Sequence, residues 1–431
     1  MEVFSISILL ISFLLLLSIG TPVAWSIIIS SLFTLFVSVP FLPALTTISQ
    51  RMATGIDSFA LLAIPFFILS GELMNSGGVA HRLVAFAKTL VGFLPGGLAL
   101  INIISAMLMG SVAGSAMASA SAMGSILGPE MEKEGYSRGF GVAINITSAT
   151  TGLVIPPSNI LIVYSLASGG ASIAALFLAG YIPGILTGLF LMIVAMLWAK
   201  KKNFKTGKRE PLKKVLNSFV RAFPSLMLLI VVIGGIVSGV FTATEASAIA
   251  VIYTLVLGFF YKEITLKNLP SILLKSSITT AIVMFLIGAS MSMSWVLSFE
   301  NIPEMISSGI LSLSDNKIVI LLLINLTLLF VGIFMDMTPA VLIFTPIFLP
   351  IVTQLGIDPV HFGIIMILNL CIGLCTPPVG SVLFVGVGVA NTSIQKVIKP
   401  LIPLFLAMIV SLLLVTYIPA LSLWLPSIFD L

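Results

Sequence analysis

Charge is what this sequence lacks most. Asp, Glu, Lys and Arg make up 8% of its 431 residues and hydrophobic residues make up 59%, whereas a typical soluble domain has about 25% charged residues. Three stretches contain no charged residue at all: 139–199, 359–395 and 400–429. Each is long enough for one or more membrane spans of about 20 residues. The composition excludes a water-soluble fold and predicts an all-α, polytopic membrane protein.

The sequence also lacks the motifs of most enzymes. It has two histidines, His81 and His361, and no H-E-x-x-H pattern of a metalloprotease. It has no phosphate-binding glycine loop, so the chain has no usual means of hydrolysing ATP. Cys371 and Cys375 lie four residues apart in an apolar run, where we expect packing residues and no disulfide. An ion gradient is therefore the most economical energy source for transport.

The positions of the basic residues predict the topology. No basic residue precedes Arg51, so we interpret the apolar N-terminus as a first span and not as a secretory signal. A dense basic cluster from Lys200 to Lys214 predicts a cytoplasmic loop under the positive-inside rule. That rule is sufficient to explain the cluster, and a site for lipid headgroups is the less favoured alternative. Counting spans from this loop in both directions places both termini outside.

The sequence aligns with itself at an offset of 221 residues. The pattern Gly-Leu-x-x-Pro-Pro occurs at 152–157 and recurs at 373–378 without a gap. Chance produces scattered apolar identities in such a composition, but a shared hexapeptide of this kind favours duplication. We predict two repeats, 1–215 and 216–431.

The charges around the two copies differ. Lys133 and Arg138 lie in segment 130–138, whereas its counterpart 351–359 has no basic residue. The positive-inside rule then places the first segment in the cytoplasm and the second outside. Inverted repeats are typical of secondary transporters, whose substrates and ions bind near the middle of the membrane.

Each Pro-Pro pair is predicted to break a membrane helix, because proline removes the hydrogen bond to the carbonyl four residues earlier. We expect the broken helices at about 139–168 and 360–390. The freed carbonyl oxygens, with Ser158, Asn159 and Thr376 beside them, are ligands that sodium could use. A kinked helix that serves packing alone is the alternative.

A segment that looks re-entrant precedes each broken helix. Residues 110–128 are mostly Gly, Ser and Ala, which predicts a helical hairpin over about 108–132, with close helix packing as the alternative. The second hairpin is predicted at about 330–355 and contains Asp336, which aligns with Ser115. An isolated carboxylate at that depth costs about 2.5–3.5 kcal/mol. We therefore favour a functional Asp336 that faces a cavity, an ion or a cation over a structural one.

Together these motifs resemble a known family, the DctM-like large membrane subunits of tripartite ATP-independent periplasmic (TRAP) transporters. The resemblance covers nearly the whole chain. The stretches that carry it are Asp57-Ser58-Phe59, 61–67, Gly71-Glu72-Leu73-Met74-Asn75, 110–115, 152–159, Thr242-x-x-Glu245-Ala246 and 373–378.

The resemblance implies an elevator-type transporter of the ion transporter superfamily in a bacterial cytoplasmic (inner) membrane. Such a subunit would import an organic anion with sodium (Na+). It would work with a small four-helix membrane subunit and a soluble periplasmic substrate-binding protein. The similarity is closest to sialic-acid (SiaM-type) members, so sialic acid or another carboxylate is the expected substrate.

The resemblance also implies the site residues. Sodium would lie between each hairpin and its broken helix. The first sodium site maps to Ser115, Gly152, Val154 and Ser158, and the second to Asp336, Thr338, Gly373, Thr376 and Pro378. We expect the substrate to contact Ser111, Ser119, Asn159 and Gly380.

Two other functions stay open at this point. The first is a stand-alone sodium/carboxylate symporter that needs no binding protein. The second is a membrane scaffold or an intramembrane hydrolase, although no nucleophile and base pair is visible to support hydrolysis.

Overall fold

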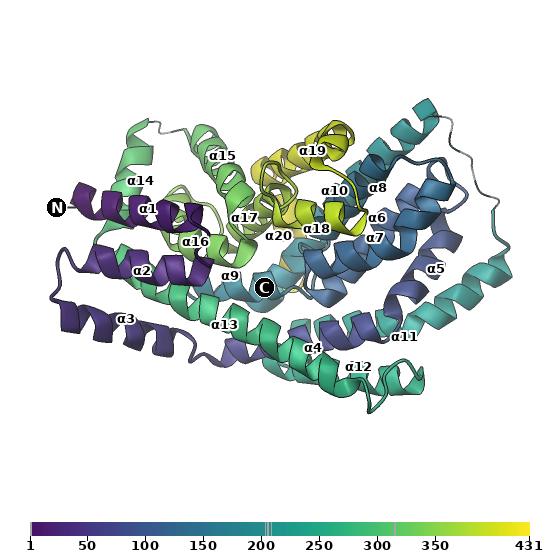
Figure 1. The fold of residues 1–431 in the computed structure, drawn as a ribbon, viewed down its shortest axis with the longest axis horizontal. Coiled ribbons are helices and arrows are strands. Elements are labelled where there is room, and N and C mark those ends of the chain that lie inside the picture. The colour runs from purple at the N-terminus through teal and green to yellow at the C-terminus, as the bar shows by residue number, and fades with distance from the viewer. Residues whose placement is uncertain (1, 203, 205–206, 208, 314–315) are drawn as a thin grey trace.

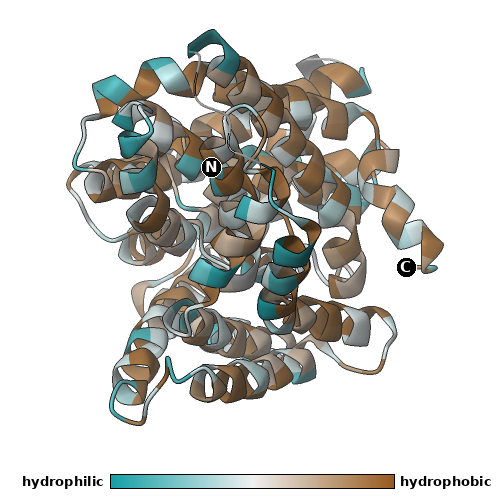
Figure 2. Ribbon diagram, turned by 90° about the vertical axis from the view of Figure 1, so that its right-hand side faces the viewer, coloured by the Kyte–Doolittle hydropathy of each residue, from teal (hydrophilic) through white to brown (hydrophobic). Residues whose placement is uncertain are grey.

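The computed structural model describes residues 2–202, 204, 207, 209–313 and 316–431. Every regular element in these ranges is a helix, which confirms the predicted all-α class. Eight helices among the described residues are long and apolar enough to cross a membrane. Figure 2 shows hydrophobic residues along most of them. Many of their large apolar side chains are exposed, as a lipid-facing surface requires.

One group of helices forms an outer layer. In Figure 1, α4, α11, α12 and α13 run along the lower side of the molecule, and α1 to α3 lie at its left. The bounds in this group are α1 Glu2–Ser18, α2 Val23–Leu35, α3 Phe41–Gly55, η1 Phe59–Leu62, α4 Ala63–Ser76, α5 Val79–Val91, α11 Leu212–Val237, α12 Ala243–Phe260, α13 Leu269–Phe299 and α14 Ile302–Leu313.

A second group packs above this layer and contains the hairpins and broken helices (Figure 1). Its bounds are α6 Gly97–Ala113, α7 Ala116–Lys133, α8 Arg138–Thr151, α9 Asn159–Ala167, α10 Ile173–Lys202, α15 Lys317–Phe334, α16 Met337–Gln354, α17 Pro359–Gly373, α18 Ser381–Val389, α19 Ile394–Tyr417 and α20 Ala420–Ile428.

Two hairpins of similar form are present. The first is α6 and α7, with its tip at Gly114 and Ser115, and the second is α15 and α16, with its tip at Met335 and Asp336. Gly114 ends α6 at φ +60°, a conformation that costs little only for glycine. The arms begin ahead of the predicted hairpin ranges, because α6 starts at Gly97 and α15 at Lys317.

Two helices are broken where the Pro-Pro pairs lie. The chain leaves α8 after Thr151 and resumes as α9 at Asn159; it leaves α17 after Gly373 and resumes as α18 at Ser381. Each broken helix packs against both arms of the hairpin that precedes it. The hairpin and broken-helix architecture predicted for both halves is thus confirmed, whereas the division at 215 and 216 stays a proposal.

Several local predictions can be checked against the caps. The Thr242 and Glu245 capping box is present, with the Thr242 amide donating to Glu245 Oε2 at 2.8 Å. Pro22, predicted to be the first helical residue, is instead the N-cap of α2, which begins at Val23. Cys371 and Cys375 are both buried and free, as expected.

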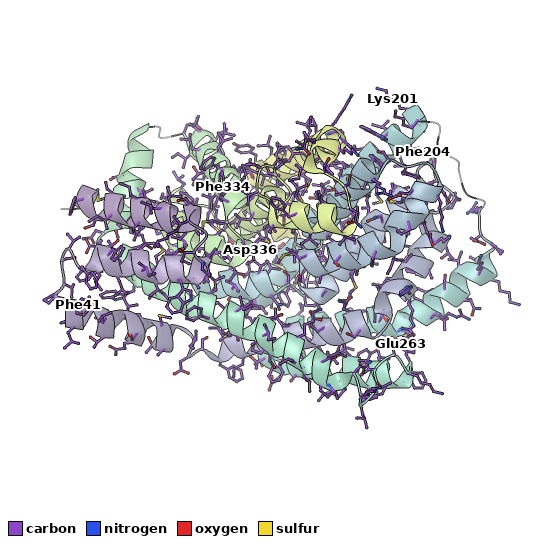
Figure 3. All side chains as sticks on the ribbon, viewed as in Figure 1. Phe41, Lys201, Phe204, Glu263, Phe334 and Asp336 are labelled. Atoms are coloured by element: carbon purple, nitrogen blue, oxygen red, sulfur yellow. The ribbon has the colours of Figure 1, made fainter. Side chains whose placement is uncertain are left out.

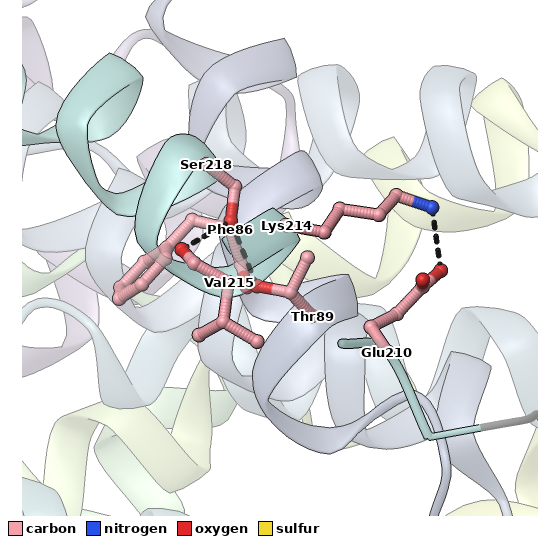
Figure 4. A network of polar contacts seen from close by, with 6 residues as sticks. All are labelled: Phe86, Thr89, Glu210, Lys214, Val215 and Ser218. Atoms are coloured by element: carbon pink, nitrogen blue, oxygen red, sulfur yellow. Dashed lines mark hydrogen bonds and ion pairs between the residues drawn. The ribbon is translucent and has the colours of Figure 1, made fainter. Parts of the chain in front are cut away.

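The basic loop connects two helices of the two groups. Lys214 pairs with Glu210 at 2.7 Å, and nearby α5 contacts α11 through the Thr89 and Ser218 hydroxyls at 2.9 Å (Figure 4). Lys205 and Lys208, which belong to the predicted basic cluster, lie outside the described residues.

Candidate functional site

A cavity of about 300 Å³ lies where the two hairpin tips meet the outer layer. The hairpins contribute residues at the starts of α7 and α16, and the broken helices contribute residues at the starts of α9 and α18. The outer layer contributes one face of α4 and one of α13. The polar side chains that line the cavity are Glu72, Asn75, Ser115, Asn159, Thr279, Asp336 and Thr338.

Three helices begin at this cavity. Ser115 is the N-cap of α7 and its hydroxyl accepts a hydrogen bond from the Ala118 amide at 3.2 Å. Ser158 and Asp336 hold the N-cap positions of α9 and α16. The first-turn amides of a helix have no acceptor within it, and the helix dipole places partial positive charge there. This arrangement favours a negatively charged ligand in the cavity.

Asp336 is a charged side chain at the centre of the molecule, as Figure 3 shows. Its side chain is exposed to the cavity, although protein surrounds it. No Lys, Arg or His of the described residues lies within 4 Å of its carboxylate. The counterpart Ser115 occupies the same N-cap position in the first hairpin but is neutral. The cavity therefore has an acidic wall on one side and an uncharged wall on the other.

The first break contains a buried hydroxyl with no partner. Ser158 is 1% exposed and its Oγ has no hydrogen-bond partner. The carbonyl of Gly152 is not wholly freed by the proline pair, because the Ile155 amide donates to it at 3.3 Å. A carbonyl oxygen has a second lone pair, so Gly152 keeps one for an ion. Val154 is fully buried beside it.

The second break has the same form. The Thr376 amide donates to the Gly373 carbonyl at 2.9 Å, and its hydroxyl donates to the Ile372 carbonyl at 2.7 Å. Pro378 is exposed. The Gly380 amide donates to the Ile333 carbonyl at 3.2 Å, which ties this break to the second hairpin.

Glycine lets each hairpin approach its broken helix closely. A Cβ atom on Gly152 would lie 2.9 Å from the Gly110 Cα, and one on Gly373 would lie 2.6 Å from the Gly332 Cα. Backbone atoms cannot move aside as a flexible side chain can, so a larger residue would separate the two elements. The breaks are thereby held within reach of the hairpin tips.

The structure distributes the predicted substrate residues unequally. Asn159 lines the cavity and packs against Gly114, whereas Ser111, Ser119 and Gly380 are buried and are not among the lining residues. The Ser119 hydroxyl donates to the Ala106 carbonyl at 2.8 Å and so links the two arms of the first hairpin. Substrate contacts by these three residues stay a prediction.

Three lining residues were not predicted. Glu72 and Asn75 lie on α4, and their 71–75 stretch is part of the family resemblance without a role assigned to it. Glu72 pairs with Lys275 at 2.8 Å. Thr279 lies in the middle of the long apolar helix α13, where no pattern in the sequence distinguishes it. Helices remote in sequence bring these residues to the cavity.

The membrane spans and the cavity between two hairpin tips define a transport protein of the membrane and not an enzyme. Residues 10–421 match the family described as the tripartite ATP-independent periplasmic transporter, DctM component. The chain belongs to this family. It is therefore a TRAP transporter large permease, a multi-pass protein of the bacterial inner membrane.

Relatives with similarity over nearly the whole chain agree with this assignment. The chain is 56% identical over 427 residues to the uncharacterized protein YgiK of Salmonella typhimurium, covering 99% of this chain and 98% of YgiK. It is 40% identical over 414 residues to the isethionate TRAP transporter permease protein DctMQ of Oleidesulfovibrio alaskensis, covering 96% and 65%. It is 38% identical over 420 residues to the sialic acid TRAP transporter large permease protein SiaM of Vibrio cholerae, covering 96% of each.

The fold is similar to that of a solved membrane transporter. The YdaH transporter of Alcanivorax borkumensis superimposes with a TM-score of 0.65 at 13% identity, over 90% of each chain. At that identity the likeness concerns the fold alone. It supports the all-α transporter architecture and assigns no substrate.

Proposed function

We propose that this chain is the large membrane subunit of a sodium-coupled, binding-protein-dependent secondary importer of an organic anion. The observation that carries the proposal is the position of Asp336 at the start of α16, open to a cavity onto which two further helix starts converge. The helix starts favour an anion, and the carboxylate favours a cation. A site that needs both is a site for coupled binding.

The charges give a physical reason for coupling to sodium. An anionic substrate about 4 Å from an ionised Asp336 would be repelled by about 4 kcal/mol at an effective dielectric constant of 20. A sodium ion bound to the carboxylate removes most of that repulsion. The substrate then binds well when sodium is present and poorly when it is absent, and by linkage it strengthens sodium binding equally.

The neutral first break supplies a candidate for another sodium site. Its Ser158 hydroxyl is buried without a partner, and Gly152 keeps a free lone pair on its carbonyl oxygen. A buried hydroxyl without a partner is costly, by about 1–3 kcal/mol. A sodium ion coordinated there would offset that cost.

The substrate class rests on charge. The relatives named for isethionate and for sialic acid take a sulfonate and a carboxylate, both organic anions. Their identities to this chain, 40% and 38%, are nearly equal, so similarity does not favour sialic acid over other anions. We propose an organic anion, with sialic acid or another carboxylate as the candidates.

The partners follow from the family. The chain is one component of a tripartite system, and the permease DctMQ extends well beyond the matched region. We propose a separate small membrane subunit of four helices and a periplasmic substrate-binding protein as the partners of this chain.

An elevator movement suits the packing between the two groups of helices. A Cβ atom on Gly71 of α4 would lie 2.8 Å from the Ala113 carbonyl, at the tip of the first hairpin. The absence of a side chain lets α4 lie directly against that tip. We propose that the hairpins and broken helices move as one body along this surface.

Uptake into proteoliposomes tests the whole proposal. The purified chain with its small subunit should accumulate a labelled organic anion when a binding protein and an inward sodium gradient are both supplied. Replacing sodium by potassium should abolish accumulation. Uptake that persists without the binding protein would favour the stand-alone symporter, and uptake that ignores sodium would refute the coupling.

A further inference from the structure

A second cavity, of about 870 Å³, lies at the end of the molecule where α8 begins, α10 ends and α19 begins. Lys201 and Phe204, which line it, lie at the upper right in Figure 3. Its charged lining residues are Arg138, Lys201, Lys202, Lys396 and Lys399, and no acidic side chain is among the residues that line it. We call it the basic cavity.

The cations of the basic cavity are mostly unpaired. Arg138 donates from its Nε to Glu132 at 2.8 Å. The four lysines have no carboxylate within 4 Å among the residues that the structure describes, and all four are exposed. Four like charges that share one cavity repel each other, so a bound anion would relieve a cost that the protein alone does not.

The positive-inside rule explains the sign of these residues but not their convergence. They come from three segments far apart in the sequence, at 138, 201–202 and 396–399. The first and third segments are held together by close backbone packing, since a Cβ atom on Gly139 would lie 2.1 Å from the Lys396 carbonyl oxygen. The cavity is therefore a fixed feature of the fold and not an accident of mobile side chains.

Two further features of the cavity suit an oxyanion. α8 and α19 both begin there, so their first-turn amides and positive dipole ends add to the charge of the lysines. The hydroxyl of Thr392, another lining residue, is buried and has no hydrogen-bond partner. A phosphate group can accept from all these donors at once.

The surroundings select a lipid as the source of that phosphate. Trp198 and Phe204 line the cavity, and Trp is enriched where membrane spans meet the headgroup layer. Along α19, Ile398, Ile402 and Leu406 are exposed at four-residue spacing, next to Lys399. They form an apolar stripe on which an acyl chain can lie while the lysines hold the headgroup.

We propose that the basic cavity binds the phosphate group of an anionic phospholipid of the cytoplasmic leaflet. This inference does not depend on the proposed transport function. Because each Lys or Arg near an anionic surface contributes about fivefold to binding, removing two lysines should weaken the site about 25-fold.

Fluorescence quenching by brominated lipids tests the proposal with Trp198 as the reporter. The triple variant Trp25→Phe, Trp295→Phe, Trp424→Phe leaves Trp198 as the single tryptophan and is reconstituted into phosphatidylcholine nanodiscs. At equal mole fraction, brominated phosphatidylglycerol should quench Trp198 more strongly than brominated phosphatidylcholine. Lys396→Gln with Lys399→Gln should remove the difference, and Lys201→Gln with Lys202→Gln provides a second variant if the first folds poorly.

The control keeps the same loss of charge on the same side of the membrane. Lys213→Gln with Lys267→Gln removes two exposed lysines outside the cavity and should leave the preference unchanged. If millimolar inorganic phosphate in the buffer abolishes the preference, the site takes phosphate from a soluble source, which contradicts selection of a lipid. Equal quenching by the two lipids, or a preference that survives both cavity variants, would overturn the proposal.

Discussion

The Sγ of Cys371 donates a hydrogen bond to the carbonyl oxygen of Thr150, 221 residues earlier in the chain, at 3.0 Å. That spacing equals the offset at which the sequence aligns with itself, so the two residues are counterparts. Counterparts can touch only where the axis relating the two copies passes between them. The contact supports duplication and places the axis between α8 and α17, the first arms of the two broken helices.

The first prediction concerns packing at this axis. Cys371 is fully buried, so Cys371→Leu should overpack the contact between α8 and α17 and destabilise the protein by about 1–3 kcal/mol. Thermal unfolding of the purified protein in detergent measures the effect. Val410→Leu, at a side chain that is 49% exposed on α19, should leave the unfolding temperature unchanged. A Cys371→Leu protein as stable as the wild type would contradict the packing described.

The second prediction concerns Asp336. Asp336→Asn removes the carboxylate charge while keeping the size, and should weaken apparent sodium affinity by about 10- to 100-fold, the range for a charged hydrogen-bonding partner. Uptake at varied sodium concentration measures this. Glu304→Gln removes an exposed carboxylate at the start of α14 and should transport normally. Unchanged sodium dependence in Asp336→Asn would exclude a sodium site at this carboxylate.

The third prediction separates an ion ligand from an unsatisfied hydroxyl. Ser158→Ala should leave stability without sodium unchanged or slightly higher, because it removes a buried group that has no partner. It should nevertheless lower apparent sodium affinity about tenfold, the loss expected for one ligand. Ser225→Ala removes a similarly buried, unpartnered hydroxyl from α11 and should change neither quantity. If both variants have wild-type sodium affinity, Ser158 is not a ligand.

The fourth prediction concerns the approach of hairpin to broken helix. Gly373→Ala and Gly152→Ala each place a Cβ against backbone, at 2.6 and 2.9 Å from the facing Cα, and should each cost about 1–3 kcal/mol and reduce uptake. Gly128→Ala is the matched control, because a Cβ atom on Gly128 would have no other atom within 4 Å. It should stabilise α7 by up to about 1 kcal/mol. Equal behaviour of the three variants in thermal unfolding would refute the close packing.

Much of the fold is predictable because its signals are local. Proline removes a hydrogen bond within its own helix, so the Pro-Pro pairs predict both breaks from the sequence alone. A charged residue in an apolar run is costly wherever the run lies in the membrane, which identifies Asp336 without coordinates. The basic residues predict the sidedness for the same reason.

The cavity could be predicted only in part. Ser115, Asn159, Asp336 and Thr338 are among its predicted residues, and all four line it. Ser119 belongs to the same small-residue segment as Ser115, yet its hydroxyl bonds to α6 because the helix turns it towards the other arm of the hairpin. The spacing of serines along a helix does not reveal which neighbour each face will meet.

The sequence by itself determined that this protein lies in a membrane, that it has paired breaks and hairpins, and that one carboxylate lies at depth. Each of these follows from the cost of charge in lipid or from the geometry of proline and glycine, which act over a few residues. The tertiary structure alone decided that Glu72 and Thr279 line one cavity with Asp336, and that three basic segments share another. Those sites exist because helices distant in the chain pack together, and packing depends on the shapes of all the faces at once.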